Sequence, residues 1–155
     1  MALLTWLESS SLSIWVREGE SIWAFPTILT LHTFGLGLLV GAAAVVDLRL
    51  LGIGRRMPLE PFRQLFNVMW LGFWLNLVTG SLLFAADATA RGTSTFFLTK
   101  LLFVAIGVTT TVLIKRSVFP DRPEVTAAAS PKLLALVSLA AWTAAITTGR
   151  LLAYV

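Results

Sequence analysis

Four apolar stretches constrain this chain more than any other feature of its sequence. They cover residues 26–46, 64–86, 96–114 and 132–153. Each is about as long as the 20 or so residues that a helix needs to cross the hydrocarbon core of a bilayer. Four strands are too few to close a barrel, and lipid does not tolerate an open sheet edge, so each span is expected to be helical. The sequence therefore predicts an all-α fold, a membrane-embedded bundle of four transmembrane helices that forms one domain over residues 1–155.

The composition agrees with a membrane environment. Of the 155 residues, 57% are hydrophobic and only 13% are charged, whereas an ordinary soluble domain has about 25% charged residues. The net charge is +4, but the basic residues cluster in two loops, which favours anionic lipid headgroups over nucleic acid as a partner. The chain has no cysteine, so thiolate metal sites and iron–sulfur clusters are excluded.

The segment over residues 3–16 is shorter and mixed in character. Its apolar residues can share one helical face, with Glu8 and several serines on the opposite face. This pattern predicts a helix that lies in the membrane interface, with Trp6, Trp15 and Trp23 at the level of the headgroups.

The basic residues also predict how the chain is oriented. The two long connections hold eight of them, and the other side of the membrane holds four: Arg49, Arg55, Arg56, Arg63, Lys115, Arg116, Arg122 and Lys132 against Arg17, Arg91, Lys100 and Arg150. Because cytoplasmic loops are enriched in lysine and arginine, we expect a multi-pass membrane protein with both long connections in the cytoplasm and both termini on the outer side.

Polar residues near the ends of the spans are the candidate site. Each span places one of them at a similar depth on the outer side: His32, Asp87, Lys100 and Arg150. An ionisable residue inside a span is costly and is by default a functional candidate. The hypothesis is that the four groups converge on one outer pocket, where Asp87 pairs with Lys100 or Arg150. Asn76 lies in mid-membrane and needs a partner on another helix or on a ligand.

Each of these residues also has a structural interpretation. Lys100 and Arg150 could extend to the outer interface, and Asp87 could be a solvated helix end. His32 is too deep for that, about 9 Å from the start of its span, and could be either an interhelical hydrogen-bonding residue or a ligand, metal or proton-transfer residue. A single histidine excludes a bis-histidine haem within one chain, while a haem shared between two chains, a five-coordinate haem or a quinone remains open.

Small residues and one carboxylate complete the pattern. Gly37 and Gly41 on the first span, and Gly72 and Gly80 on the second, are predicted to line helix–helix contacts, because small residues let backbones approach closely. Asp47, at the inner end of the first span, is expected to pair with a nearby arginine.

Two runs of residues resemble a known group of proteins. They are WAFPTILTLHTFG at 23–35, followed by Gly41 and DLRLLG at 47–52, and TGSLLF at 79–84, followed by Asp87 and FLTK at 97–100. The pattern resembles a group of small bacterial four-helix membrane proteins with no assigned activity, and is distantly similar to copper-resistance D-type membrane proteins. The resemblance implies that His32, Asp87 and Lys100 occupy marked positions of the group. The chain lacks the further histidines of the copper-resistance and b-type cytochrome relatives.

Three functions fit the sequence. The first is a binding module without catalytic activity of its own, which holds haem, quinone or lipid through His32, Lys100, Arg150, Asp87 and Asn76 and acts beside a redox partner. The second is a structural or accessory subunit that packs against itself or against other membrane proteins. The third is an oligomeric channel or transporter with a path lined by His32.

Overall fold

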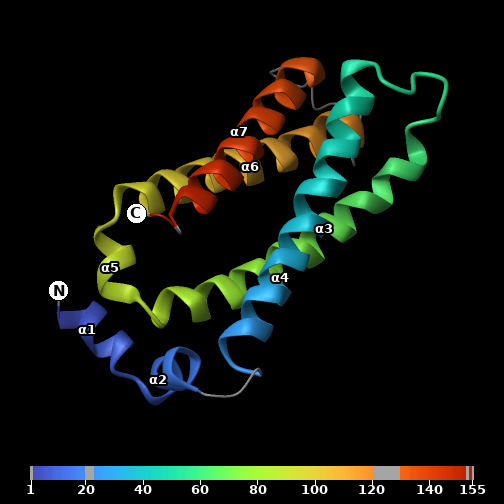
Figure 1. The fold of residues 1–155 in the computed structure, drawn as a ribbon. Helices are drawn as coiled ribbons and strands as arrows, with labels where there is room; N and C mark the ends of the chain where they lie inside the picture. The colour runs from blue at the N-terminus through green and yellow to red at the C-terminus, as the bar shows by residue number, and fades with distance from the viewer. Residues whose placement is uncertain (1, 20–22, 121–129, 153, 155) are drawn as a thin grey trace.

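Helices make up almost all of the computed structural model, which describes residues 2–19, 23–120, 130–152 and 154. No strand occurs in the described part of the chain. The elements are α1 (Ala2–Glu8), α2 (Ser11–Glu18), α3 (Phe25–Leu51), the 3-10 helix η1 (Glu60–Gln64), α4 (Leu65–Ala85), α5 (Ala88–Thr93), α6 (Thr95–Val118) and α7 (Pro131–Leu151) (Figure 1). Helix α3, η1 with α4, α6 and α7 are each long and apolar enough to cross a membrane. The predicted all-α fold with four membrane helices is confirmed.

Helix α3 continues beyond its predicted end. The prediction stopped at residue 46, before the first charged residue, but the helix ends only at Leu51. Gly52 then takes the left-handed conformation, with a φ of 114°, and its N–H bonds the carbonyls of Leu48 and Arg49. A glycine in this conformation is a common helix end. As a result, Asp47 lies inside the helix rather than in a loop.

The N-terminal segment forms two short helices instead of the single interfacial helix expected over 3–16. Ser10 starts the second helix, because its side chain accepts a hydrogen bond from the N–H of Ser13, as N-cap residues do. Trp6 and Trp23 are 71% and 70% exposed, so their rings are accessible to the membrane interface.

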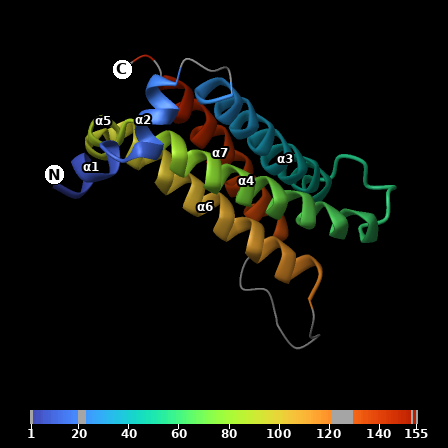
Figure 2. The ribbon, with the colours of Figure 1, turned by 90° about the horizontal axis from the view of Figure 1, so that it is seen from below.

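The spans form two antiparallel hairpins, α3 with α4 and α6 with α7. The hairpins touch mainly through α3 and α7. They approach each other at the end that carries the 52–64 connection, here called the loop end, and diverge toward the end that carries both chain termini, here called the terminal end (Figure 1). Figure 2 shows the 52–64 connection and the two termini at opposite ends of the bundle. Helices α1, α2 and α5 lie at the terminal end. The main buried core is formed by α3, η1, α4, α6 and α7: Leu39, Ala42, Ala43, Val46, Phe62, Phe66, Met69, Ile114, Leu134, Trp142 and Ala145.

Glycines set the contact between α3 and α4. A Cβ atom on Gly72 would lie 2.6 Å from the backbone nitrogen of Leu39 and 2.7 Å from the carbonyl oxygen of Gly35. A Cβ atom on Gly80 would lie 3.1 Å from the ring of His32. Gly72 and Gly80 therefore line a helix contact, as predicted.

The other predicted glycine contact is wrong within this chain. A Cβ atom on Gly37 or Gly41 would meet nothing within 4 Å. At about 100° per residue, both glycines lie opposite the face of α3 that buries Leu39 and Ala43. Their face is left exposed by the chain, and the close approach uses Gly35 instead.

Candidate functional site

His32 faces the interior of the bundle, between α3 and α4. Its Nδ1 lies 3.0 Å from Thr79 Oγ1, and that hydroxyl lies 2.6 Å from the carbonyl oxygen of Leu75. A hydroxyl has one proton to donate. If Thr79 donates it to Leu75, Thr79 accepts from the Nδ1–H of His32, and Nε2 then carries the lone pair. This arrangement satisfies both bonds and leaves one nitrogen of His32 able to accept a proton or bind a ligand.

Asn76 bonds its own helix through its side-chain amide. Its Nδ2 donates to the carbonyl of Gly72, one turn earlier on the same helix, at 3.1 Å. The same atom fills the space over Gly35, where a Cβ atom would lie 2.6 Å away. Asn76 therefore lies at the crossing of α3 and α4, and a ligand as its partner stays a prediction.

Lys100 lies near the start of α6 and is half-buried. Its aliphatic stem packs over Gly149 of α7, where a Cβ atom would lie 3.4 Å from Cδ and 3.9 Å from Nζ. Both His32 and Arg91 are within electrostatic range of its ammonium group. Among the described residues no carboxylate forms an ion pair with Lys100. The site therefore holds several basic groups, and no acidic side chain among the described residues neutralises the charge of Lys100.

Asp87 and Arg150 do not join His32. Asp87 Oδ2 lies 3.3 Å from Nε of Arg91, so the expected pairing with Lys100 or Arg150 is wrong. The reason is the short helix α5, which was not predicted from the sequence and which places Arg91 one turn after Asp87. Arg150 is exposed at the end of α7. Of the four residues in the predicted layer, His32 and Lys100 lie close enough to interact electrostatically, although no hydrogen bond joins them among the described residues.

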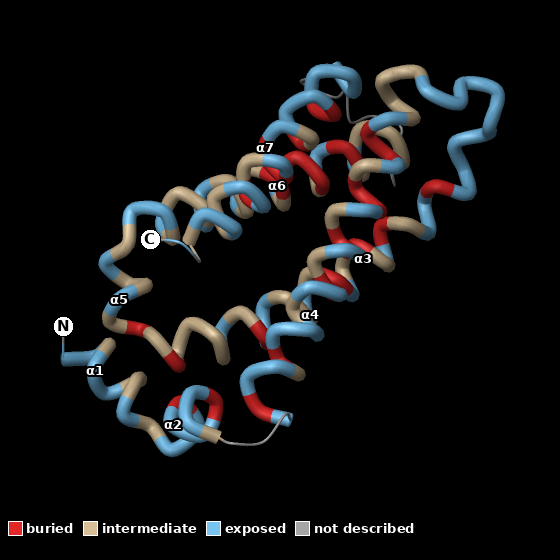
Figure 3. The backbone as a smooth tube through the Cα atoms, viewed as in Figure 1, coloured by how far each residue is buried: buried red, intermediate tan, exposed pale blue. Residues whose placement is uncertain are grey.

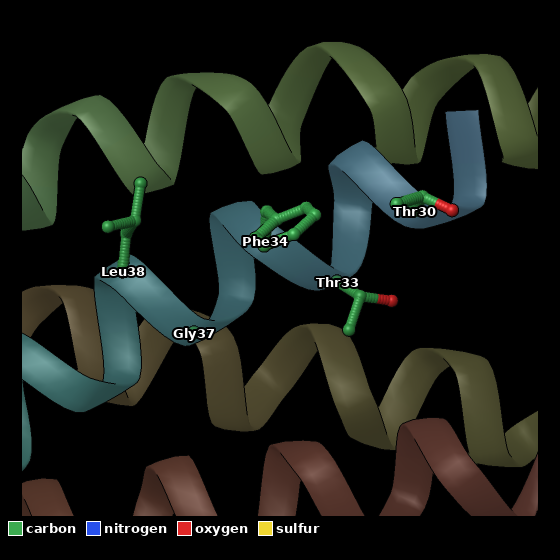
Figure 4. A pocket seen from close by; sticks show the side chains of 5 residues that line it. All are labelled: Thr30, Thr33, Phe34, Gly37 and Leu38. Carbon is green, nitrogen blue, oxygen red and sulfur yellow. The ribbon is translucent and has the colours of Figure 1, made fainter. Parts of the chain in front are cut away.

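A concavity of about 460 Å³ lies on the exposed face of α3, lined by Thr30, Thr33, Phe34, Gly37 and Leu38 (Figure 4). It is not the predicted pocket at His32. Gly37 is five residues from His32, which places it about 140° around the helix. The concavity instead arises where Gly37 has no side chain to fill the surface between its larger neighbours.

No group of three or more histidine, cysteine, aspartate or glutamate side chains that could hold a metal ion occurs in the described part of the chain. A metal ion at His32 would therefore need its other ligands from backbone groups, water or another chain.

Sequence reasoning missed a second polar cluster, at the loop end. Asp47 is 1% exposed and Ser138 is fully buried, and the serine lies beside the carboxyl group. The expected ion pair of Asp47 with an arginine is absent among the described residues. Arg49 instead donates to the carbonyls of Arg55 and Met57. The sequence did carry one sign that Asp47 is buried. When the helix is extended to Leu51, Asp47 lies on the same face of α3 as the buried residues Ala43 and Val46.

Glu8 ties α1 to α5 at the terminal end. Its carboxylate accepts hydrogen bonds from the hydroxyl of Thr89 and, at 3.0 Å, from the Thr89 backbone N–H. It also lies 3.3 Å from Arg17. The Thr89 hydroxyl, the Thr89 N–H and then Arg17 lower the pKa of Glu8 below its ordinary value, against an opposing effect of desolvation. A charged Glu8 therefore holds the N-terminal helices against α5, the short helix between α4 and α6.

No protein-family model matches the chain, and no curated protein or solved structure matches it either. Its function is therefore inferred from its own residues and their geometry.

Proposed function

We propose that this protein is an integral membrane binding module that holds a small amphiphilic ligand with an anionic or oxygen-rich polar group. The ligand would lie between the two hairpins at the terminal end, near His32 and Lys100. The observation that carries the proposal is the half-buried Lys100, which lies among basic groups and has no carboxylate partner in the described part of the chain.

The electrostatics favour a negatively polarised ligand. Like charges that approach each other away from bulk water repel strongly, and a desolvated ammonium group costs free energy unless it is paired. A phosphate, a carboxylate or a quinone oxygen would supply the missing partner of Lys100. Once His32 is protonated, its Nε2–H could donate a second hydrogen bond to the same group.

The helix arrangement favours a ligand with an apolar body. His32 belongs to the α3–α4 hairpin and Lys100 to the α6–α7 hairpin, and these hairpins diverge toward the terminal end (Figure 1). A lipid or a quinone could extend its chain along the exposed apolar residues that follow Lys100 on α6, Leu101 and Leu102, while its polar group stays near the interface. For a quinone or a haem, a role beside a redox partner would follow. As the one histidine of the chain, His32 could supply one axial ligand of a haem and not two, so it supports haem less than it supports a quinone or a lipid.

Topology supports the same placement. With the basic loop end in the cytoplasm, the terminal end, and with it His32 and Lys100, would lie in the outer leaflet of a bacterial inner membrane. The protein would then take its ligand from the periplasmic half of the bilayer.

The proposal can be tested by identifying what co-purifies with the protein in a mild detergent. Mass spectrometry of the extract and an absorption spectrum would distinguish a quinone, a haem and a phospholipid. We expect one amphiphile at a fixed ratio to the wild-type protein. Lys100→Met removes a charge-assisted hydrogen bond of about 1.5–3 kcal/mol, so ligand occupancy should fall as for an affinity loss of about tenfold or more.

Lys132→Met is the matched control, because Lys132 is exposed at the opposite end of the bundle. Lys132→Met should retain the ligand. His32→Ala should lose the ligand, as Lys100→Met does, and its helical content should be measured in parallel to exclude unfolding. Equal amounts of the same amphiphile in wild type, Lys100→Met and His32→Ala would reject the binding site.

A second candidate function is that of a self-assembling membrane subunit. The exposed face of α3 supports it, because Gly37 and Gly41 have open space above them and Phe34, which is 66% exposed, projects beside them. A second copy of α3 could place its own Phe34 over these glycines, since small residues allow close helix contacts in lipid. Such a face would be self-complementary about a twofold axis.

The oligomeric state in detergent tests this candidate. Gly41→Leu should convert a dimer into a monomer without loss of helical content. Ala105→Leu, a comparable enlargement at an exposed position of α6, should leave the dimer intact. A monomeric wild-type protein, or a dimer unaffected by Gly41→Leu, would exclude association through this face.

A further inference from the structure

A buried carboxyl group lies far from His32, near the loop end of the bundle. Asp47 of α3 is 1% exposed, and Ser138 and Trp142 of α7 are 0% and 2% exposed. Ser138 and Trp142 are one helical turn apart, so they share the face of α7 that contacts α3. Figure 3 shows that buried stretches of the two hairpins meet at this end.

The polar atoms of this cluster have no regular hydrogen-bond partners. Oδ2 of Asp47, Oγ of Ser138 and Nε1 of Trp142 are buried and have no hydrogen bond of regular geometry, although Ser138 lies within reach of the Asp47 carboxyl group. The indole ring is held in place by Gly107 of α6, where a Cβ atom would lie 2.7 Å from Cε2. Most buried polar groups in proteins are paired, so three unpaired ones in one region call for a chemical explanation.

No basic side chain in the described part of the chain neutralises Asp47. The elements packed around it carry Lys132 on α7, Lys115 on α6 and, on η1, Arg63, which lies 4.0 Å from Glu60. None of these forms an ion pair with Asp47 among the described residues. On its own helix, Arg49 donates to two backbone carbonyls of the 52–64 connection.

Burial without a cation makes the charged form of the carboxyl group expensive. An ionised carboxylate without a partner is strongly disfavoured in an apolar interior, and buried carboxyl groups commonly take up a proton instead. A protonated carboxyl group also gains an O–H donor. The hydroxyl oxygen of Ser138, which has no regular partner, could accept from it.

We propose that Asp47 is an intramembrane proton-binding site, and that the bound proton holds α3 against α7. In this state Oδ2–H donates toward Ser138 Oγ. Release of the proton to water at the loop end would leave a buried negative charge and loosen the contact between the two hairpins. The site is separate from the one proposed at Lys100, and either could exist without the other.

A bound proton fits the surroundings better than a bound metal cation. A cation such as Na⁺ needs several oxygen ligands, and Ser138 is the one hydroxyl among the described residues that is placed beside the Asp47 carboxyl group. The described residues also contain no cluster of acidic or histidine side chains that could hold a metal ion.

Infrared spectroscopy tests the protonation state directly. The wild-type protein at neutral pH should show the carbonyl stretch of a protonated carboxylic acid, with the expected shift in D₂O. Asp47→Asn should remove this band. Glu60→Gln, which changes an exposed carboxylate at the same end, should leave it in place. If the wild type lacks the band at neutral pH, Asp47 is ionised and the proposal is wrong.

Thermal unfolding gives an independent measurement. Asparagine matches the shape of a neutral aspartic acid, so Asp47→Asn should unfold at the wild-type temperature at neutral pH. In alkaline buffer the wild type should unfold at a lower temperature, whereas Asp47→Asn should show no such decrease. A wild-type stability that depends on Na⁺ concentration instead of pH would replace the proton with a metal cation and overturn the proposal. If Asp47→Asn retains the same amount of the co-purifying amphiphile as the wild type, the proton site at Asp47 and the ligand site at Lys100 are distinct.

Discussion

At the scale of single residues, the Thr79 hydroxyl determines how His32 is held. Thr79 is 4% exposed, and its hydroxyl lies between the imidazole and the carbonyl of Leu75. Thr79→Val keeps the shape of the side chain and leaves a ring nitrogen of His32 unsatisfied. We expect a loss of about 1–3 kcal/mol in the free energy of unfolding, measured by circular dichroism in detergent.

Thr147→Val provides the comparison for Thr79→Val. Thr147 is exposed on α7, and its hydroxyl bonds the carbonyl of Thr143 in the same helix. Its loss should change stability by less than about 0.5 kcal/mol. Equal effects of the two substitutions would mean that the contact between His32 and Thr79 contributes nothing measurable.

Glu8 gives the terminal end a dependence on pH. Its pKa is lowered by Thr89 in the folded protein, so the folded state binds fewer protons than the unfolded state in mildly acidic solution. The stabilisation is complete above the ordinary pKa of glutamate and is lost as the pH falls through the lowered value. Hydrogen exchange of the amides in α1 and α5, corrected for intrinsic rates, should therefore be slow at neutral pH and accelerate in acid.

Glu8→Gln should show the faster exchange at both pH values, because glutamine cannot bind Thr89 as a charged acceptor. Glu18→Gln is the control, since Glu18 pairs with Arg17 but is 61% exposed. If the amides of α1 and α5 exchanged at the same rate in Glu8→Gln and in the wild type, the hydrogen bonds between Glu8 and Thr89 would not stabilise these helices in solution.

Asp47 shows why residue-level reasoning from the sequence was incomplete. Its position at the end of an apolar stretch made it look solvated and paired with an arginine. Only the course of α7, which places Ser138 beside it, reveals that it is buried. The inward orientation of His32 was predictable from the helical pattern, but its partner Thr79 depended on the register between α3 and α4.

At the scale of elements, the crossing of α3 and α4 depends on Gly72. Gly72→Ala would bring a Cβ atom within 2.7 Å of backbone atoms of α3, and backbone cannot yield as a flexible side chain can. We expect a destabilisation of about 1–3 kcal/mol, as for other overpacked sites, seen as a lower unfolding temperature.

Gly37→Ala is the matched substitution on the opposite face of α3. It adds a Cβ atom where nothing lies within 4 Å and removes a residue of low helix propensity, so it should be neutral or stabilising by up to about 1 kcal/mol. If Gly37→Ala were as damaging as Gly72→Ala, the face with Gly37 would be packed in the assembled protein.

The spans themselves were predictable because length and hydropathy determine them. The ends of the spans were harder to predict. Helix α3 continues past the apolar stretch that ends at residue 46 and stops at Gly52. Helix α5 lies in a connection that is too short and too polar to show a helical pattern. The choice of Gly35 over Gly37 for the close contact depends on the rotation of α3, which glycine spacing alone does not specify.

At the scale of the whole molecule, the arrangement of basic residues predicts a single orientation. The chain has no cysteine, so single cysteines can be placed at Ala90 and Arg56, exposed positions at opposite ends of the bundle. An impermeant thiol reagent applied to intact cells should label Ala90→Cys and not Arg56→Cys. Lysed cells should show labelling of both. Labelling of Arg56→Cys alone in intact cells would reverse the orientation.

The divergence of the two hairpins has a consequence for the bilayer itself. Helices that meet at one end and separate at the other give the molecule a larger cross-sectional area in one leaflet than in the other. The leaflet at the terminal end must then spread around a wider body, so a membrane that is convex on the terminal-end side would accommodate the molecule better than a flat one. When many copies lie in one patch of membrane, the differences in area between the two leaflets would add up. The protein would then collect in curved regions of the membrane in preference to flat ones.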